Sequence, residues 1–175
     1  MAKVHEPSRV QQVCEALITA LDAADHEGVS YVDIIGATRT YSTLADITDI
    51  GDSVVAVVAP QFTKRVRTSN GTYARYVVVD ILVRIHLTND ASEDMATMDQ
   101  RVYLLEEIDN HLADPDFHDL ALPDGAIAEY VEPTDSRADA DIRDGLGVMW
   151  DSDMLDTDRQ VTGLVRVAYR VDEDY

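Results

Sequence analysis

Cysteine, lysine and aromatic residues are all scarce in this chain of 175 residues. Cys14 is the only cysteine, which excludes an intrachain disulfide and a cysteine-based zinc cluster. Basic side chains number 14 against 34 acidic ones, so the formal net charge is −20. DNA readers need a basic surface, and proteins held on anionic lipid need basic segments. The composition therefore disfavours both classes.

Long apolar runs are also missing. Val54–Pro60 is among the longest, and it is too short to span a bilayer. Residues 1–7 contain no apolar signal core, so we expect a soluble protein that is not exported by a signal peptide and has no membrane partner. The length and the 46% hydrophobic content predict a single domain over 1–175 with a core of its own.

The scarcity of lysine is more informative than the acidity. Lys3 and Lys64 are the only lysines, and 25 of the 34 acids are Asp. An Asp-rich, lysine-poor composition is typical of proteins from organisms that keep molar salt in their cytoplasm. At such salt the Debye length is about 3 Å, so repulsion among the carboxylates is largely screened. An ordinary acidic protein is the alternative, but acidity alone does not require the loss of lysine.

Two segments have helical periodicity. Over 8–24, Ser8 is a suitable N-cap, and Cys14 lies within an apolar stripe, so we expect its thiol to pack in the core. Over 92–113, Ser92 is the expected cap, and Asp114-Pro115 ends the helix. The apolar positions of the two stripes are Val10, Val13, Leu17, Ile18 and Leu21, then Met95, Met98, Val102, Leu105, Ile108 and Leu112.

The strongest strand signal covers 53–88. Two arms rich in β-branched residues flank Asn70-Gly71, a pair that supplies the positive φ of a tight hairpin turn. The second arm alternates as a half-buried strand does, with Asp80 on its more polar face. Both arms are long, so we expect the turn to project, and Pro60 predicts a bulge.

The remaining sequence predicts an acidic irregular region over 113–159, within which Gly125–Glu132 is a candidate strand, and a C-terminal strand over 160–171. The order of elements predicts an α+β fold: an antiparallel sheet that includes the long projecting β-hairpin, with the two amphipathic helices packed on one face.

No residue set predicts catalysis, a cofactor or a metal site, so we expect a protein that is not an enzyme. Asp139, Asp141 and Asp144 resemble the start of an EF-hand loop, but Arg143 stands where an oxygen ligand is needed. Four further acids could surround a cation only if the backbone curled around it: Asp151, Asp153, Asp156 and Asp158. His111 and His118 lack a third ligand and are expected to be solvated.

The hairpin is the exception to the acidity. Residues 53–79 contain no Asp or Glu and four basic residues, so this window carries +4 and the rest of the chain −24, which sum to −20. One interpretation is that strands exclude acids and the turn needs solubility. The other is a surface for an acidic partner, a second copy of this chain or a nucleic acid held through its phosphates. The candidate contact residues are Lys64, Arg65, Arg67, Asn70 and Arg75.

The order of the predicted elements resembles that of the tail terminator proteins of tailed viruses. The residues that carry the resemblance are Val77–Leu87, Met98–Leu112 and the C-terminal strand that begins Gln160-Val161-Thr162-Gly163. The resemblance implies a virion protein of the tail and neck, assembled in the host cytoplasm as a homo-oligomeric, hexameric ring. Its partners would be the tail tube protein and a neck or connector protein, and DNA would pass through the lumen without sequence recognition.

Combined with the composition, the resemblance points to a tailed virus of haloarchaea. Two alternatives stay open. One is another neck or head-completion protein, such as a stopper. The other is a small acidic host protein, either an enzyme or a ligand-binding domain.

Overall fold

A computed structural model of the chain describes residues 7–26, 29–30, 38–39, 55–68, 71–86, 91–151 and 160–173. The helices in these residues are α1 (Arg9–Ala23), α3 (Ala91–Ala113) and the short α4 (Ala140–Arg143). The strands are β1 (Asp25–His26), β2 (Val29–Ser30), β3 (Thr38–Arg39), β4 (Val55–Arg67), β5 (Tyr73–His86), β6 (Leu120–Ala121), β7 (Ile127–Tyr130), β8 (Gly147–Asp151) and β9 (Gln160–Glu173).

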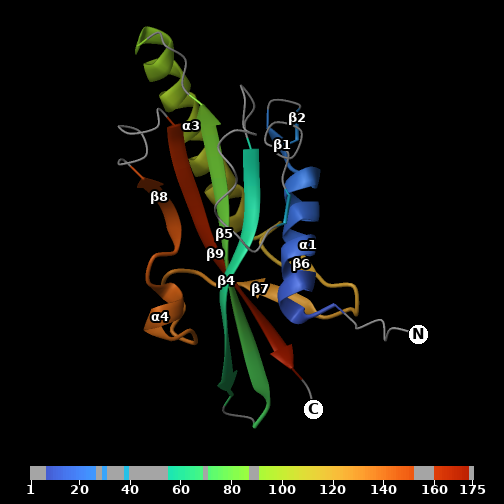
Figure 1. The fold of residues 1–175 in the computed structure, drawn as a ribbon. Helices are drawn as coiled ribbons and strands as arrows, with labels where there is room; N and C mark the ends of the chain where they lie inside the picture. Colours follow the sequence, from blue (N-terminus) through green and yellow to red (C-terminus); the bar gives the residue numbers. More distant parts are fainter. Residues whose placement is uncertain are drawn as a thin grey trace, which may run out of the picture.

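One sheet dominates the fold, and its described strands run in the order β3-β4-β5-β9-β7-β6, with β8 also paired to β9 (Figure 1). Every pairing in it is antiparallel except the two-residue pairing of β3 with β4. The long strands β4, β5 and β9 form its centre. The predicted α+β fold with an antiparallel sheet is confirmed.

Helices α1 and α3 pack on the same face of the sheet, as predicted. The main core joins Val13, Leu17 and Leu21 of α1 and Leu105, Ile108 and Leu112 of α3 to alternate residues of the central strands, among them Val77, Val79, Val165 and Val167. Cys14 is fully buried in this core. The predicted cap of the first helix is confirmed as a capping box, in which Ser8 Oγ accepts from the backbone N of Gln11 and Gln11 Oε1 accepts from that of Ser8. The second helix begins at Ala91, one residue before its expected cap.

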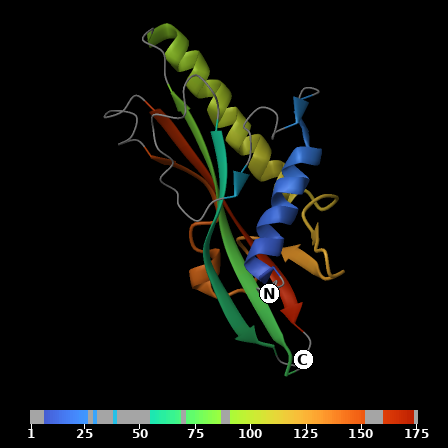
Figure 2. The same cartoon turned by 45° about the vertical axis from the view of Figure 1, so that its right-hand side comes forward.

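The hairpin of β4 and β5 has the predicted bulge, because its register shifts between Pro60 and Phe62. Gly71 has φ 83°, which a glycine adopts without strain, and Thr68 N donates to Thr72 O at 2.9 Å across the turn. The turn end runs past α1 and α4 (Figures 1 and 2). The hairpin does not extend alone, because β9 stays paired with β5 as far as Tyr73, opposite Glu173.

The second face of the sheet differs from the half-buried pattern that the sequence predicts for β5. Val78, Asp80 and Leu82 are buried. The cover over part of this face is residues 131–146, here called the acidic excursion, whose Val131, Ala138 and Ile142 pack with Ala74, Tyr76, Val78 and Ala168. This excursion leaves the edge of β9 after Val131 N bonds Ala168 O and rejoins the same edge where Gly147 pairs with Arg166.

The expectation of an irregular region over 113–159 therefore needs correction. Between Leu120 and Asp151 it contains β6, β7, α4 and β8. Strand β7 lies within the candidate strand at 125–132, whereas β6, α4 and β8 have five residues or fewer and are too short for hydrophobic periodicity to be visible in the sequence. None of the described helices has both the length and the apolar character needed to cross a membrane.

Candidate functional site

The turn end of the hairpin gathers three guanidinium groups on the helix-bearing face of the sheet. Arg65 and Arg75 lie directly opposite each other across β4 and β5, an arrangement that is repulsive by itself. Glu173 of β9 stands between them: its Oε2 accepts from Arg65 Nε at 3.0 Å and its Oε1 from Arg75 Nε at 2.6 Å. The Arg75 guanidinium, and then Arg65, hold the pKa of Glu173 below its usual range.

The third guanidinium of this group, that of Arg67, contacts no carboxylate among the described residues. Arg67 is exposed and forms no ion pair or hydrogen bond with any described residue. Arg65 also lies over the ring of Tyr73, with its Cζ 4.2 Å from the ring centroid, which fixes one cation in place. Among the described residues on this face, three guanidiniums against one carboxylate leave a net +2, in a molecule of charge −20.

Lys64 lies on the other face of β4 and is not part of this group. Its Nζ contacts Asp139 at 2.8 Å and Asp141 at 2.9 Å, so it ties the acidic excursion to the hairpin. The candidate contact residues thus divide between two faces, and Lys64, Arg65 and Arg75 find acidic partners within their own chain. Asn70, also a candidate, lies outside the described residues.

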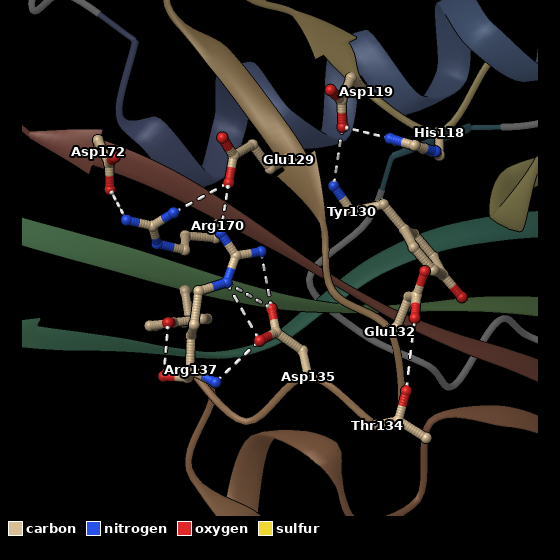
Figure 3. Close-up of polar contacts among 11 residues, drawn as sticks. His118, Asp119, Glu129, Tyr130, Glu132, Thr134, Asp135, Arg137, Arg170 and Asp172 are labelled. Carbon is tan, nitrogen blue, oxygen red and sulfur yellow. Dashed lines mark hydrogen bonds and ion pairs between the residues drawn. The ribbon is translucent and has the colours of Figure 1, made fainter. Parts of the chain in front are cut away.

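A hollow of about 550 Å³ lies beside β7, at the edge of the sheet where the acidic excursion begins (Figure 3). Four carboxylates and a single guanidinium line it. The residues around this hollow, here called the acidic pocket, are His118, Asp119, Glu129, Tyr130, Glu132, Thr134, Asp135, Ser136 and Arg137.

One wall of the acidic pocket is a network of alternating charges. Arg137 holds Asp135 through Nη2 at 2.9 Å and approaches Glu129 at 3.4 Å, and Glu129 also accepts from Arg170 at 2.9 Å (Figure 3). The hydrogen bond from Arg137 lowers the pKa of Asp135, and the same contact raises the pKa of Arg137. These residues neutralise one another and fix the shape of the wall.

The opposite wall is formed by His118, Asp119 and Tyr130. Asp119 Oδ1 accepts from His118 Nε2 at 3.1 Å and from the backbone N of Tyr130 at 3.2 Å (Figure 3). Burial raises the pKa of Tyr130 to about 12, so its phenol stays neutral. Burial likewise raises the pKa of Tyr169, whose ring meets that of Tyr130 edge-on at 6.1 Å.

The expectation that both histidines are solvated is wrong. His118 is half-buried and paired with Asp119, and His111 stacks on Phe117 with ring centroids 5.0 Å apart. Burial lowers the pKa of His111. The acidic turn between the two histidines is compact, which the sequence spacing could not indicate.

Glu132 differs from the other carboxylates of the acidic pocket. It is exposed, and within the described chain the one hydrogen bond of its carboxylate is accepted from Thr134 Oγ1 at 3.4 Å. No described cation pairs with it, and Figure 3 shows it on the Tyr130 side of the hollow, away from Arg137. It is therefore the carboxylate that is open to an external cation.

A second hollow, of about 350 Å³, lies between α1 and β6 and shares Asp119 with the acidic pocket. Its lining is mostly apolar, with Ala16, Ala20 and Ala23 on the helix and Leu120 and Ala121 on the strand. Strand β6 pairs with β7 alone among the described strands, so it forms the edge of the sheet there.

Two of the acids that resemble the start of an EF-hand loop form ion pairs with a lysine of the hairpin. Asp139 precedes α4, and with Asp141 it binds Lys64. In the part of the chain that the structure describes, no three His, Cys, Asp or Glu side chains are grouped so as to hold a metal ion. The acids of the other candidate cluster at 153, 156 and 158 lie outside that part.

Comparison with known proteins assigns no family: no family model matches the sequence, and no curated protein matches it. Sequence reasoning found the basic end of the hairpin but missed the acidic pocket. Its residues come from 118–137, where the sequence shows acids at irregular intervals, and their arrangement depends on the pairing of β7 with β9, which places Glu129 opposite Arg170.

Proposed function

We propose that this protein is a structural subunit of a tailed virus of haloarchaea, a tail terminator that forms a ring at the head–tail junction. The ring would end the polymerisation of the tail tube and join the tube to the neck. The observation that carries this proposal is the arrangement of one antiparallel sheet with two helices on one face and a long hairpin whose turn end runs past them. The same arrangement underlies the resemblance in the order of elements.

The distribution of charge supports a ring. A subunit of a ring contacts its neighbours through two different surfaces, one on each side, which must complement each other. The hairpin end carries a net +2 on a body that is otherwise strongly acidic, so one surface of this chain is complementary to others of the same chain. Such complementarity sets register and partner choice more than affinity.

The acidity also suits a passage for DNA. Carboxylates facing a lumen offer the phosphates no cation to bind, so DNA would pass without binding, and molar salt would screen the repulsion between subunits. The ring would contact the tail tube protein on one side and a neck or connector protein on the other.

Mass determination at molar salt tests the proposal directly. A species of six chains is the expected result, and the protein is expected in purified virions at a copy number matching one ring. A chain that stays monomeric and is missing from virions contradicts the proposal. If it is present in virions but located one ring nearer the capsid, the stopper function replaces the terminator function.

A further inference from the structure

We propose that the hairpin end of one copy of this chain inserts into the acidic pocket of the next copy, where Arg67 pairs with Glu132. The inference deepens the proposed function and rests on its self-association. The two surfaces are distinct, so the contact is head-to-tail and closes into a ring when the rotation between copies allows it.

Arg67 is the cation that the hairpin leaves for a partner. Lys64 is held by Asp139 and Asp141, and Arg65 and Arg75 share Glu173. Arg67 is the last residue of β4, is exposed, and forms no ion pair within the described chain. Its position on a part of the hairpin that runs past the helices lets it reach another molecule (Figure 2).

Glu132 is the matching carboxylate. Asp135 and Glu129 are already bound to Arg137 and Arg170, and Asp119 to His118, whereas Glu132 has only the hydroxyl of Thr134. Of the four carboxylates that line the acidic pocket, Glu132 is therefore the one that no described cation contacts. A volume of about 550 Å³ accommodates the end of a hairpin side chain such as arginine.

The occupant is a second copy because the charges match in sign and in position. The described residues of the hairpin end on the helix-bearing face carry a net positive charge, and the acidic pocket is a net negative hollow on a different part of the surface. At molar salt attraction beyond about 3 Å is screened, so only ions in direct contact contribute, as a guanidinium inside a pocket would. The alternative contact, in which a strand of a second chain pairs with the edge of β4, is disfavoured because Pro60, the bulge and three cations interrupt that edge.

A charge swap tests the pairing. Arg67→Glu and Glu132→Arg should each raise the dissociation constant of the assembly at least about tenfold, because each places like charges together. The double variant Arg67→Glu/Glu132→Arg should return to within about threefold of the parent value, since the pair is restored in reverse. Gln61→Glu, exposed on the same strand, and Glu106→Arg, exposed on α3, are the matched controls and should leave assembly unchanged.

Chemical cross-linking provides a second readout. A carbodiimide joins a lysine amine to a carboxylate in contact with it, with loss of one water as the amide forms. Arg67→Lys keeps the charge and places an amine at position 67, on the opposite face of β4 from the Lys64 amine, which contacts Asp139 and Asp141 of its own chain. Mixed light and heavy-isotope chains should yield a peptide joining position 67 of one chain to Glu132 of another, and Glu132→Gln should abolish it.

The outcomes separate the inference from the proposed function. If rings form but the double variant stays as weak as the single ones, or the cross-link joins other positions, the Arg67–Glu132 contact is wrong and the ring proposal stands. If the protein is found in virions but no concentration yields an assembly of this chain alone, the contact is again overturned. If it neither assembles nor occurs in virions, both proposals fail.

Discussion

Asp80 and Arg166 lie directly opposite each other across β5 and β9 and form a bidentate ion pair. Arg166 Nε donates to Asp80 Oδ1 at 2.6 Å and its Nη2 donates to Oδ2 at 2.8 Å. Asp80 is only 3% exposed and is the one charged side chain in the buried set of the described residues. The carboxylate raises the pKa of Arg166 through its hydrogen bond.

Removal of Asp80 should be among the most damaging changes to the sheet. Asp80→Ala leaves a half-buried guanidinium without its counter-ion, and we expect a loss of about 2–4 kcal/mol in the free energy of unfolding, just under the range for fully buried pairs. Chemical denaturation at a fixed molar salt concentration measures this loss. The double variant Asp80→Leu/Arg166→Leu removes both charges and should lie closer to the parent chain; if it is as unstable as Asp80→Ala, packing rather than the lost counter-ion is responsible.

Lys64 should control the acidic excursion rather than the stability of the whole domain. Lys64→Met breaks the contacts of Nζ with Asp139 and Asp141 but keeps most of the apolar stem. Because the pair is solvent-exposed, we expect the melting temperature to change little. Amide hydrogen exchange at 138–146 should become faster while that of the central strands is unchanged. Lys64→Arg is the control that keeps the charge, and equal exchange in both variants would show that the contact does not hold the excursion.

The sequence was sufficient for the long elements and insufficient for the short ones. The stripe containing Cys14 and Leu17 spans four helical turns, and the alternation through Val165 and Val167 spans a 14-residue strand, so periodicity identified both. The excursion over Tyr76 could not be predicted, because it depends on two short strands pairing with the same edge of β9.

The basic hairpin illustrates the same limit. Counting charges grouped Lys64 with Arg65, Arg67 and Arg75, whereas the structure places the three arginines on one face of the hairpin and Lys64 on the other. The count could not reveal that Glu173, 98 residues from Arg75, forms ion pairs with two of them, because that contact follows from the register of β5 and β9. Local charge predicts a surface only when distant strands do not supply counter-ions.

The carboxylate of Glu173 should make the three central strands sensitive to acid. Its pKa is lowered in the folded chain, first by Arg75 and then by Arg65, from an ordinary value near 4.5. A depressed acid pKa contributes stability that is present above the unfolded value and is lost as the pH falls through the folded value. Glu173→Gln should therefore reduce stability at neutral pH and show a smaller decline than the parent chain when the pH falls from 5 to 3.

Denaturation at several pH values checks this difference, with Glu106→Gln on the exposed side of α3 as the control. Parallel pH profiles for the parent chain and Glu173→Gln would show that the two arginines do not favour the ionised carboxylate.

Cys14 should behave as a reporter of opening at the interface between α1 and the sheet. Burial raises the pKa of its thiol to about 11, while Arg39 lowers this pKa and Glu15 raises it by smaller amounts, so at pH 8 the sulfur is both buried and un-ionised. Thiolates are the reactive form, and labelling with a disulfide reagent should therefore require opening of the core. A raised thiol pKa contributes stability that is present below the unfolded value of 9.0 and is lost as the pH rises toward 11. Labelling should therefore accelerate steeply above pH 9.

Ser8→Ala, which removes the helix cap at a cost of about 1 kcal/mol, should accelerate labelling at pH 8 as well. Rapid labelling of the parent chain at pH 8, equal to that of the unfolded chain, would contradict the burial of Cys14.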